Sequence, residues 1–391
     1  MNLDVIISGG GATGLSFACS LADTNLNVRV YEKLSEEKLA EPPTDGRDIA
    51  LTHLSVKILK ELGAWHRIPD DAISPIKEAR VLDGTSPYFL HFDHRKIEHK
   101  ALSFLVPNHL IRKALYEQVK AVTNVQLVTG VTVTSLSTDS EKGSVVLSSG
   151  ETVEAPLVIS SDSRFSETRR NMGISTTMQD FGQMVIVCRM QHEESHDNIA
   201  YECFHYGRTL AVLPLTGNES SIVITVHHDR ADEVLNMAED KFSDDISERF
   251  EHRLGKMKLI SKRYSYPLVA VLADRFVANR YALLGDAAVG MHPVTAHGFN
   301  LGLRGQDTLA REIKSAITLG VDIGDSKGLV NYQAKHRRIS KPLYLVTNSI
   351  VRLYTNDKFL ARIMRKSILI LGNNIWSIKH AIMNQLTEIE S

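Results

Sequence analysis

The sequence predicts an α/β fold in which a Rossmann-like, dinucleotide-binding domain carries an inserted antiparallel sheet and ends in C-terminal helices. Three observations lead to this prediction. The chain opens with a strand, a glycine-rich turn, a helix and a second strand. From residue 184 to 226 it changes to strand-like runs divided by polar turns, and at 281–302 it returns to a strand, a loop and a helix.

The opening predicts a β-α-β unit. Residues 3–8 have the short apolar run of a buried strand, 12–23 have a helical pattern, and 28–31 form the second strand. The same reasoning predicts a series of further elements. These are helices at about 55–62, closed by Gly63, at 108–121 and at 232–254, and strands at 125–128, 131–137, 144–148, 157–160, 184–188, 209–213, 221–226 and 281–284.

The cofactor domain is expected to be discontinuous in sequence. We assign residues 1–75, 101–180 and 273–330 to it, and residues 76–100 and 181–272 to a substrate domain. Residues 331–391 form a C-terminal basic helical segment with ten Lys or Arg against three acids, a net charge of +7. Apolar residues recur there at helical spacing, which predicts either an amphipathic surface for anionic headgroups or helices packed on the cofactor domain.

Bulk composition excludes several classes of protein. With 391 residues, 43% hydrophobic and 23% charged, the chain has the composition of a globular protein of two domains or one large one. A net charge of -1 gives no general attraction to nucleic acid. The three cysteines, Cys19, Cys188 and Cys203, are far apart, so a disulfide framework is not expected. Without an N-terminal signal or a run of ~18 apolar residues, we expect a cytoplasmic protein.

A dinucleotide-binding motif follows the first predicted strand. Gly9, Gly11 and Gly14 match G-x-G-x-x-G between that strand and the first helix, where a backbone without side chains approaches a pyrophosphate. Glu32 ends the second strand 18 residues after Gly14 and is suited to accept hydrogen bonds from a ribose. The motif alone leaves NAD and FAD open.

A second block, at residues 281–302, favours FAD. A buried strand ends in Gly285-Asp286, and a loop with one proline leads to a helix. Asp286 is placed to bind a ribityl hydroxyl, and the turn at Gly298, Phe299 and Asn300 directs backbone N–H groups outward from the helix start. A helix N-terminus stabilises the negative charge of a reduced flavin.

The order and spacing of these motifs resemble the class A flavin monooxygenases related to p-hydroxybenzoate hydroxylase, and within them the bacterial hydroxylases of ubiquinone biosynthesis. The likeness covers nearly the whole chain. It includes the N-terminal motif, the segments 45–51, 161–169 and 285–302, and the tail from Tyr332 to Asp357. The resemblance implies an FAD-binding Rossmann-like domain of the GR2 type, with an inserted antiparallel-sheet substrate domain.

The resemblance also implies the chemistry. FAD is reduced by NAD(P)H or another donor, reacts with O2 to a C4a-hydroperoxide, and hydroxylates the ring of a polyprenylated phenol. Implied FAD contacts are Asp162, Arg47, and less directly Arg112 and the backbone at Val133. Pro293 and His297 are implied beside the flavin as catalytic-site residues. Ubiquinone-biosynthesis proteins and the inner-membrane surface are the further partners that it suggests.

Three departures from the family pattern stand out. Ser163 replaces the glycine of D-G-x-x-S-x-x-R, which bears on the approach of NAD(P)H. Ala296 and His297 replace the usual Gly-Gln before Gly298, and Val289 stands where histidine is common, with His292 three residues later.

Substrate contacts are the least specified part of the sequence. His205, Tyr206 and Arg208 fall in the predicted substrate domain, although a core or solvated role is the commoner one for single histidines. The histidines at 91, 94, 227 and 228 lack helical metal-ligand spacing, so no metal site is predicted. Alternative functions are another phenol hydroxylase, a prenyl-lipid reductase, or a non-catalytic flavin-binding member of a biosynthetic complex. A tryptophan halogenase is excluded, because the W-x-W signature is absent from a chain whose two tryptophans are Trp65 and Trp376.

Overall fold

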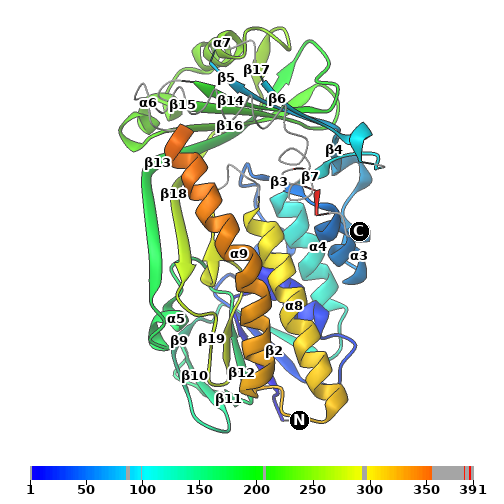
Figure 1. Cartoon of the computed structure of the whole chain (residues 1–391), viewed down its shortest axis with the longest axis vertical. Coiled ribbons are helices and arrows are strands. Elements are labelled where there is room, and N and C mark those ends of the chain that lie inside the picture. The colour runs from blue at the N-terminus through cyan, green and yellow to red at the C-terminus, as the bar shows by residue number, and fades with distance from the viewer. Residues whose placement is uncertain are drawn as a thin grey trace.

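The computed structural model describes residues 2–84, 89–97, 99–205, 208–292 and 297–354, together with Met383, Thr387 and Glu388. A mainly antiparallel sheet with helices above it forms the upper part of the molecule (Figure 1). A mainly parallel sheet and the long helices form the lower part (Figure 1).

The lower part is built on a six-stranded sheet in the order β19-β20-β12-β1-β2-β8. Its strands are β1 Val5–Ser8, β2 Val28–Glu32, β8 Val125–Thr129, β12 Leu157–Ser160, β19 Val277–Ala278 and β20 Tyr281–Leu283. All pairs are parallel except β19 with β20. Every residue of β1 is buried, as expected of a parallel strand covered on both faces.

Helices cover this sheet and two small sheets extend it. The helices are α1 Ala12–Ser20, α2 Glu36–Ala40, α3 His53–Glu61, α4 Asn108–Lys120, α5 Glu167–Asn171, α8 Gly298–Leu319 and α9 Ser326–Tyr354. One small sheet joins β3 Asp48–Leu51, β7 Ser103–Pro107 and β4 Ser74–Ile76. The other joins β11 Thr152–Ala155, β10 Gly143–Leu147 and β9 Val133–Thr138.

The upper sheet, called the roof sheet below, has the order β21-β18-β13-β16-β15-β14-β5-β6, with β17 paired to β13. Its strands are β5 Glu78–Asp83, β6 Phe89–Asp93, β13 Thr176–His192, β14 Ile199–His205, β15 Arg208–Pro214, β16 Glu219–His227, β17 Met257–Leu259, β18 Tyr264–Ala273 and β21 Val289–Gly290. Helices α6 Ala231–Leu235 and α7 Glu239–Arg249 cover its outer face. Strand β13 also runs down beside β18 into the lower part (Figure 1).

Alternation along the roof strands separates two faces. Ile186, Leu210 and Ile224 are fully buried in a cluster with Phe242 and Ile246 of α7. Residues one position away on the same strands therefore point to the inner face, toward the lower part.

Most predicted elements are present, with three corrections. The helix predicted at 232–254 is two helices, because Ala238 is extended (φ -56, ψ 144) and left-handed Glu251 and His252 follow α7. The strand predicted at 184–188 is the middle of the 17-residue β13. The helix predicted at 12–23 ends at Ser20.

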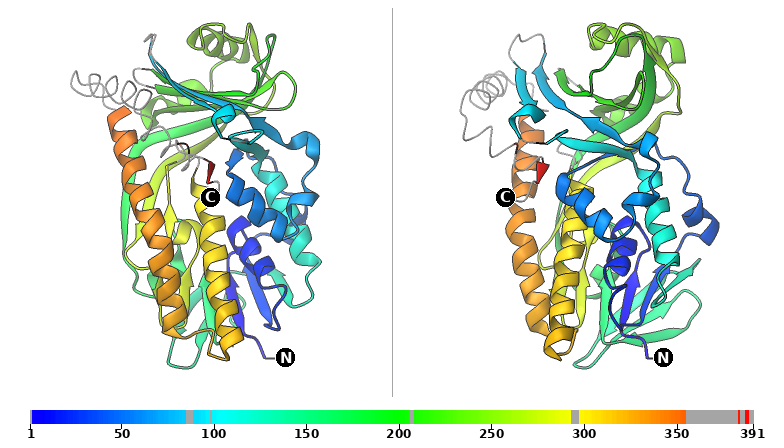
Figure 2. Two further views of the ribbon diagram at one scale, coloured as in Figure 1. Left: turned by 45° about the vertical axis from the view of Figure 1, so that its right-hand side comes forward. Right: turned by 90° about the vertical axis from the view of Figure 1, so that its right-hand side faces the viewer.

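The C-terminal helix is part of the core of the lower part. Tyr332 of α9 is fully buried and donates a hydrogen bond to the carbonyl of Leu283, 2.7 Å away. The C-terminal end lies where the roof sheet meets the lower part (Figure 2), with Met383 against Phe92 and Leu102. The basic residues Arg362, Arg365 and Lys366 of the predicted amphipathic surface lie outside the described residues. Among the helices that are described, none has the length and apolarity that crossing a bilayer requires.

Candidate functional site

The start of α1 forms an open cradle beneath the loop after β1. A Cβ atom on Gly9 (φ +104) would lie 2.6 Å from the carbonyl oxygen of Ser161, and one on Gly14 would lie 2.0 Å from that of Gly9. At Gly11, the N-cap of α1, a Cβ would meet nothing within 4 Å. No side chain caps this helix, so its first N–H groups are left for an anion such as a pyrophosphate.

Glu32 lies at the edge of this cradle. Its carboxylate is buried and accepts hydrogen bonds from the backbone N–H groups of Gly10 (2.7 Å) and Leu34 (2.9 Å). These two bonds hold the carboxylate beside the glycine turn. Each oxygen has a second lone pair, so the group can still accept bonds from ribose hydroxyls.

Val133 lies near the same end of β2. The loop before β9 pairs with the end of β2 through the N–H of Val131 and the carbonyl of Glu32, 3.0 Å apart. This brings the first residue of β9, the buried Val133, into that neighbourhood. Arg112 is half-buried on α4.

The side chain of Thr13, in the first turn of α1, contacts two elements that are far away in sequence, the turn at Gly285 and helix α8. A Cβ atom on Gly285 (φ +56) would lie 2.9 Å from its hydroxyl oxygen, and one on Gly302 of α8 would lie 2.8 Å from it. The glycine motif, the Gly285-Asp286 turn and the start of α8 therefore form one continuous surface. Thr13 occupies an unspecified position of G-x-G-x-x-G, so the motif gave no signal for it.

Asp286 and Asp162 line this surface. Asp286 is partly exposed and accepts a hydrogen bond from the guanidinium of Arg164 at 2.9 Å. Asp162 accepts from the Thr168 hydroxyl at 2.9 Å through Oδ2. Its buried Oδ1 takes no hydrogen bond from the described residues, which leaves it able to accept one from a ligand hydroxyl.

The start of α8 resembles the α1 cradle. A Cβ on Gly298 would meet nothing within 4 Å, and no side chain caps the helix at His297, which is buried. The amide of the buried Asn300 instead binds inward, donating to the carbonyl of Ala50 and accepting from the N–H of Thr52. The side chain of Asn300 therefore supports β3 and does not point outward from the helix start. Phe299 is partly buried against the core, and Pro293 lies outside the described residues.

Arg47 joins the cofactor side to the roof sheet. Its guanidinium binds Asp45 at 2.6 Å and lies 5.2 Å from the ring centre of Tyr266 on β18. The Tyr266 hydroxyl donates to the carbonyl of Asp45 at 2.6 Å. Hydrogen bonds from Arg47 outweigh burial and hold the pKa of Asp45 below its usual range.

His292, which stands three residues after Val289 in the block 281–302, is buried. His292 packs edge-on against Phe181 with ring centres 5.0 Å apart. Burial lowers its pKa to about 4, so the imidazole is neutral at pH 7.

The residues suggested as substrate contacts are separated by the structure. Arg208 points to the outer face, where it pairs with Asp245 of α7, because residues 208, 210 and 212 of β15 alternate toward the helices. Arg208 therefore lies away from the cofactor surface. His205 is the last residue of β14, and Tyr206 is outside the described residues.

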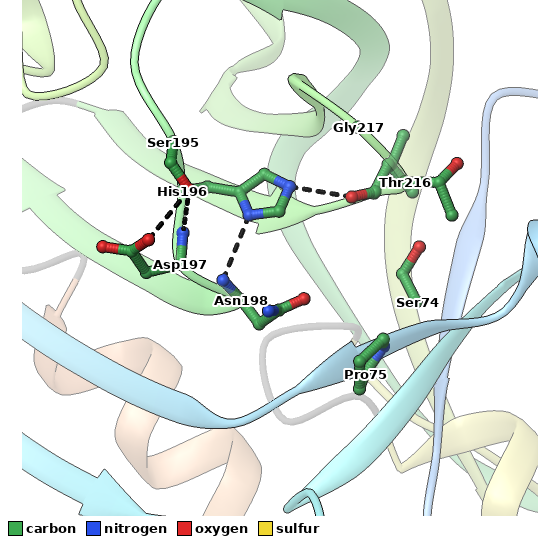
Figure 3. A pocket seen from close by; sticks show the side chains of 9 residues that line it. Ser74, Pro75, Ser195, His196, Asp197, Asn198, Thr216 and Gly217 are labelled. Carbon is green, nitrogen blue, oxygen red and sulfur yellow. Dashed lines mark hydrogen bonds between the residues drawn. The ribbon is translucent and has the colours of Figure 1, made fainter.

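A surface pocket of about 380 Å³ lies apart from this surface, between the tip of β4 and two roof loops (Figure 3). It holds Ser195, His196 and Asp197, the residue types of a nucleophilic triad. Both ring nitrogens of His196 are taken by backbone atoms, the carbonyl of Leu215 and the N–H of Asn198. The Ser195 hydroxyl donates to the carboxylate of Asp197 at 2.8 Å and not to the histidine, so these three residues do not form a Ser-His-Asp triad.

Within the described residues, two groups bring metal-ligand atoms close together. One is the exposed His227, His228 and Asp229, and the other is Glu78, His91 and Asp93 on β5 and β6. In the second group Arg80 and Arg95 already pair with the two carboxylates. The hydrogen bonds from Arg95 lower the pKa of Asp93 to about 2.

Comparison with known proteins gives consistent matches. The model of a family described as FAD binding domain matches residues 2–344. Ubiquinone hydroxylase UbiM of Neisseria meningitidis serogroup C is 44% identical, over 99% of this chain and 85% of that protein. Ubiquinone hydroxylase UbiL of Rhodospirillum rubrum is 35% identical, over 90% of this chain and 82% of that protein. The crystal structure of p-nitrophenol 4-monooxygenase PnpA from Pseudomonas putida has the same fold, with a TM-score of 0.78 over 99% of this chain and 98% of that one, at 17% identity.

Proposed function

The chain belongs to the family of FAD-dependent monooxygenases that share this FAD-binding domain, and we propose that it hydroxylates the aromatic ring of a polyprenylated phenol in ubiquinone biosynthesis. The substrates named in its relatives support the substrate class. NAD(P)H or another reductant is the proposed electron donor, and O2 is the proposed source of the oxygen atom.

The observation that carries the proposal is the convergence on Thr13. It aligns two uncapped helix starts and the Gly285-Asp286 turn along one surface. A ligand that uses all three must be extended, with a phosphate group at one end and hydroxyls along its length. FAD has this form, and the open space at Gly11 and Gly298 fits its close approach to the backbone.

Each part of the surface has a proposed task. The first turn of α1 binds the pyrophosphate, and Glu32 binds the ribose of the adenosine half. Asp286 and the free oxygen of Asp162 bind hydroxyls between the two ends. The start of α8 directs its N–H groups at the flavin end, where a helix N-terminus stabilises negative charge.

When bound, FAD supplies the redox chemistry that reduces O2 and hydroxylates the ring. The protein supplies position, charge and a dry environment. Arg47 and Tyr266 close the side between the cofactor surface and the roof sheet, and neutral His292 adds no charge there. The inner face of the roof sheet then excludes water from the reacting ring.

The test is a reaction of the purified holoenzyme with a short-chain 2-prenylphenol, NAD(P)H or a chemical reductant, and isotopically labelled O2. The expected result is a product with one added, labelled oxygen atom on the ring, identified by mass spectrometry. A saturated prenyl chain with an unchanged ring would indicate a prenyl-lipid reductase instead. A flavin that reduces but gives no product from any prenylated phenol would favour a non-catalytic flavin protein.

A further inference from the structure

The inner face of the roof sheet carries one continuous row of side chains across seven strands. Directly opposed residues run from β6 through β5, β14, β15, β16 and β13 to β18. In that order they are Leu90, Val81, Glu202, Ala211, Val223, Val187 and Tyr264. Six are apolar or aromatic. Glu202 is therefore the single carboxyl in an otherwise apolar row.

Alternation along β14 places Glu202 on the inner face. Its neighbours Tyr201 and Cys203 belong to the outer cluster beneath α7. Ala200, two positions before it on the inner face, packs with Ile76 and Leu105 of the lower part. Glu202 thus lies on the inner face of the roof sheet, the face toward the cofactor domain.

Two contacts tie this row to the proposed flavin surface. At one end, a Cβ on Gly46, the residue before Arg47, would lie 2.5 Å from the Tyr264 ring and 3.0 Å from Val187. On the other side, Ala50 packs beside the Ala200 cluster, and its carbonyl accepts a hydrogen bond from Asn300 at the start of α8. Glu202 is three strands from Val187, about 14 Å at ~4.8 Å per strand.

The carboxyl of Glu202 makes no contact with the described residues that would explain it as a stabilising group of the fold. None of the described residues donates a hydrogen bond to its carboxyl or forms an ion pair with it. The charges of Arg80 and Arg253 act on the neighbouring Tyr201, whose side chain points to the other face. A carboxyl that stands among apolar groups without a partner costs free energy that an apolar side chain would save. Glu202 has intermediate exposure to solvent, which gives a small molecule access to it.

On the premise of the proposed function, we propose that Glu202 binds the phenolic hydroxyl of the substrate and so selects phenols over rings without a free hydroxyl. The apolar residues on either side of Glu202 provide the flat surface against which an aromatic ring packs. In either protonation state the carboxyl keeps an oxygen that accepts the O–H of a phenol.

The surroundings of Glu202 agree with this role. Burial among apolar groups raises its pKa to about 8, so the carboxyl is mainly neutral at pH 7. A neutral group does not repel an electron-rich ring or an anionic flavin. The hydrogen bond then orients the ring.

The experiment uses the FAD-loaded full chain and two probes, 2-geranylphenol and its methyl ether. Binding is measured by the change in flavin absorbance, with no turnover required. Wild type is expected to bind the phenol about tenfold or more tightly than the ether, the value of one buried hydrogen bond. Glu202→Ala should bring this ratio close to one, and Glu202→Gln, which keeps an acceptor oxygen, should restore part of it.

Glu248→Gln is the matched control, since Glu248 is an exposed acid of α7 on the outer side of the same sheet. It should keep the wild-type ratio, and all variants should keep their FAD. A Glu202→Ala variant that prefers the phenol as strongly as wild type overturns the inference while the proposed function stands. A wild type that binds phenol and ether equally also overturns it. A wild type that binds neither probe and hydroxylates no prenylated phenol overturns the proposed function, and the inference with it.

Discussion

Ser163 stands in a backbone conformation that favours glycine. Its backbone φ is +98, and it lies in a loop. The Ser163 side chain is exposed and makes no hydrogen bond with the described residues. Replacing it with glycine therefore removes strain without removing a contact. Ser163→Gly is expected to stabilise the protein and to widen the approach to the flavin.

The magnitude follows from two opposing effects. A non-glycine residue in such a region costs ~1 to 3 kcal/mol. Glycine loses more backbone entropy on folding, at a cost of ~0.5 to 1 kcal/mol. The net gain in the free energy of unfolding is therefore about 0.5 to 2 kcal/mol. It should be visible as a higher urea midpoint of the apoprotein with an unchanged slope.

Asn198→Gly is the matched control. Asn198 also has a positive φ, +58, but asparagine adopts this left-handed region readily, so its relief should be smaller. Stopped-flow reduction of the holoenzyme by NAD(P)H is the second assay, with faster reduction expected in Ser163→Gly only. An unchanged or lower urea midpoint for Ser163→Gly would refute the strain argument. An unchanged reduction rate would show that the serine does not hinder the donor.

Three further predictions test the site and its supports. Glu32→Ala and Asp286→Ala should each weaken FAD binding roughly tenfold to a hundredfold, as measured by equilibrium dialysis; two variants with wild-type affinity would mean that the cofactor surface is misassigned. Arg189→Ala should destabilise the protein by about 3 kcal/mol at pH 7, because the fully buried carboxylate of Asp48 loses its partner at 2.6 Å; burial raises the pKa of Asp48, so the loss should shrink as the pH falls and the carboxyl becomes protonated in both proteins, and a pH-independent loss would contradict this. The fully buried His336 has its pKa lowered to about 4, so the unfolded chain takes up its proton near pH 6.5 while the folded chain stays neutral; stability should fall by about 3 kcal/mol between pH 6.5 and 4, and His336→Phe should reduce that fall in urea titrations.

Sequence pattern specifies the glycines of the cradle at α1 more sharply than any residue of the roof sheet, for a physical reason. Gly9 and Gly14 are required by backbone contacts that no other residue allows, so they leave a pattern in the sequence. Asn300 shows the limit, because its position at the helix start was predicted but the inward direction of its amide depends on β3. Glu202 left no pattern at all. Its meaning depends on parallel pairing with β5, more than a hundred residues earlier in the chain.

The same limit applies to the roof sheet. The residues of β5, β14 and β18 were assigned to the substrate domain but were not predicted as strands, because their edges pair with segments distant in sequence. The break between α6 and α7 was missed since Ala238 favours helices in isolation and is held extended by its surroundings. The local sequence pattern indicates only the helix or strand propensity of a segment, whereas the pairing of these strands and the break between α6 and α7 are set by tertiary contacts.

The place of β20 in the parallel sheet has a consequence for biosynthesis. The outer edge of β12 has no partner until residues 281–283 have left the ribosome, and the Tyr332 contact that holds β20 comes some fifty residues later. The intervening roof strands can pair among themselves first, as a contiguous insertion. The nascent chain therefore carries an open, apolar sheet edge from the synthesis of β12 until that of β20, which is a site for chaperones and for aggregation. Cofactor uptake is thereby a late event, after nearly the whole polypeptide has been made.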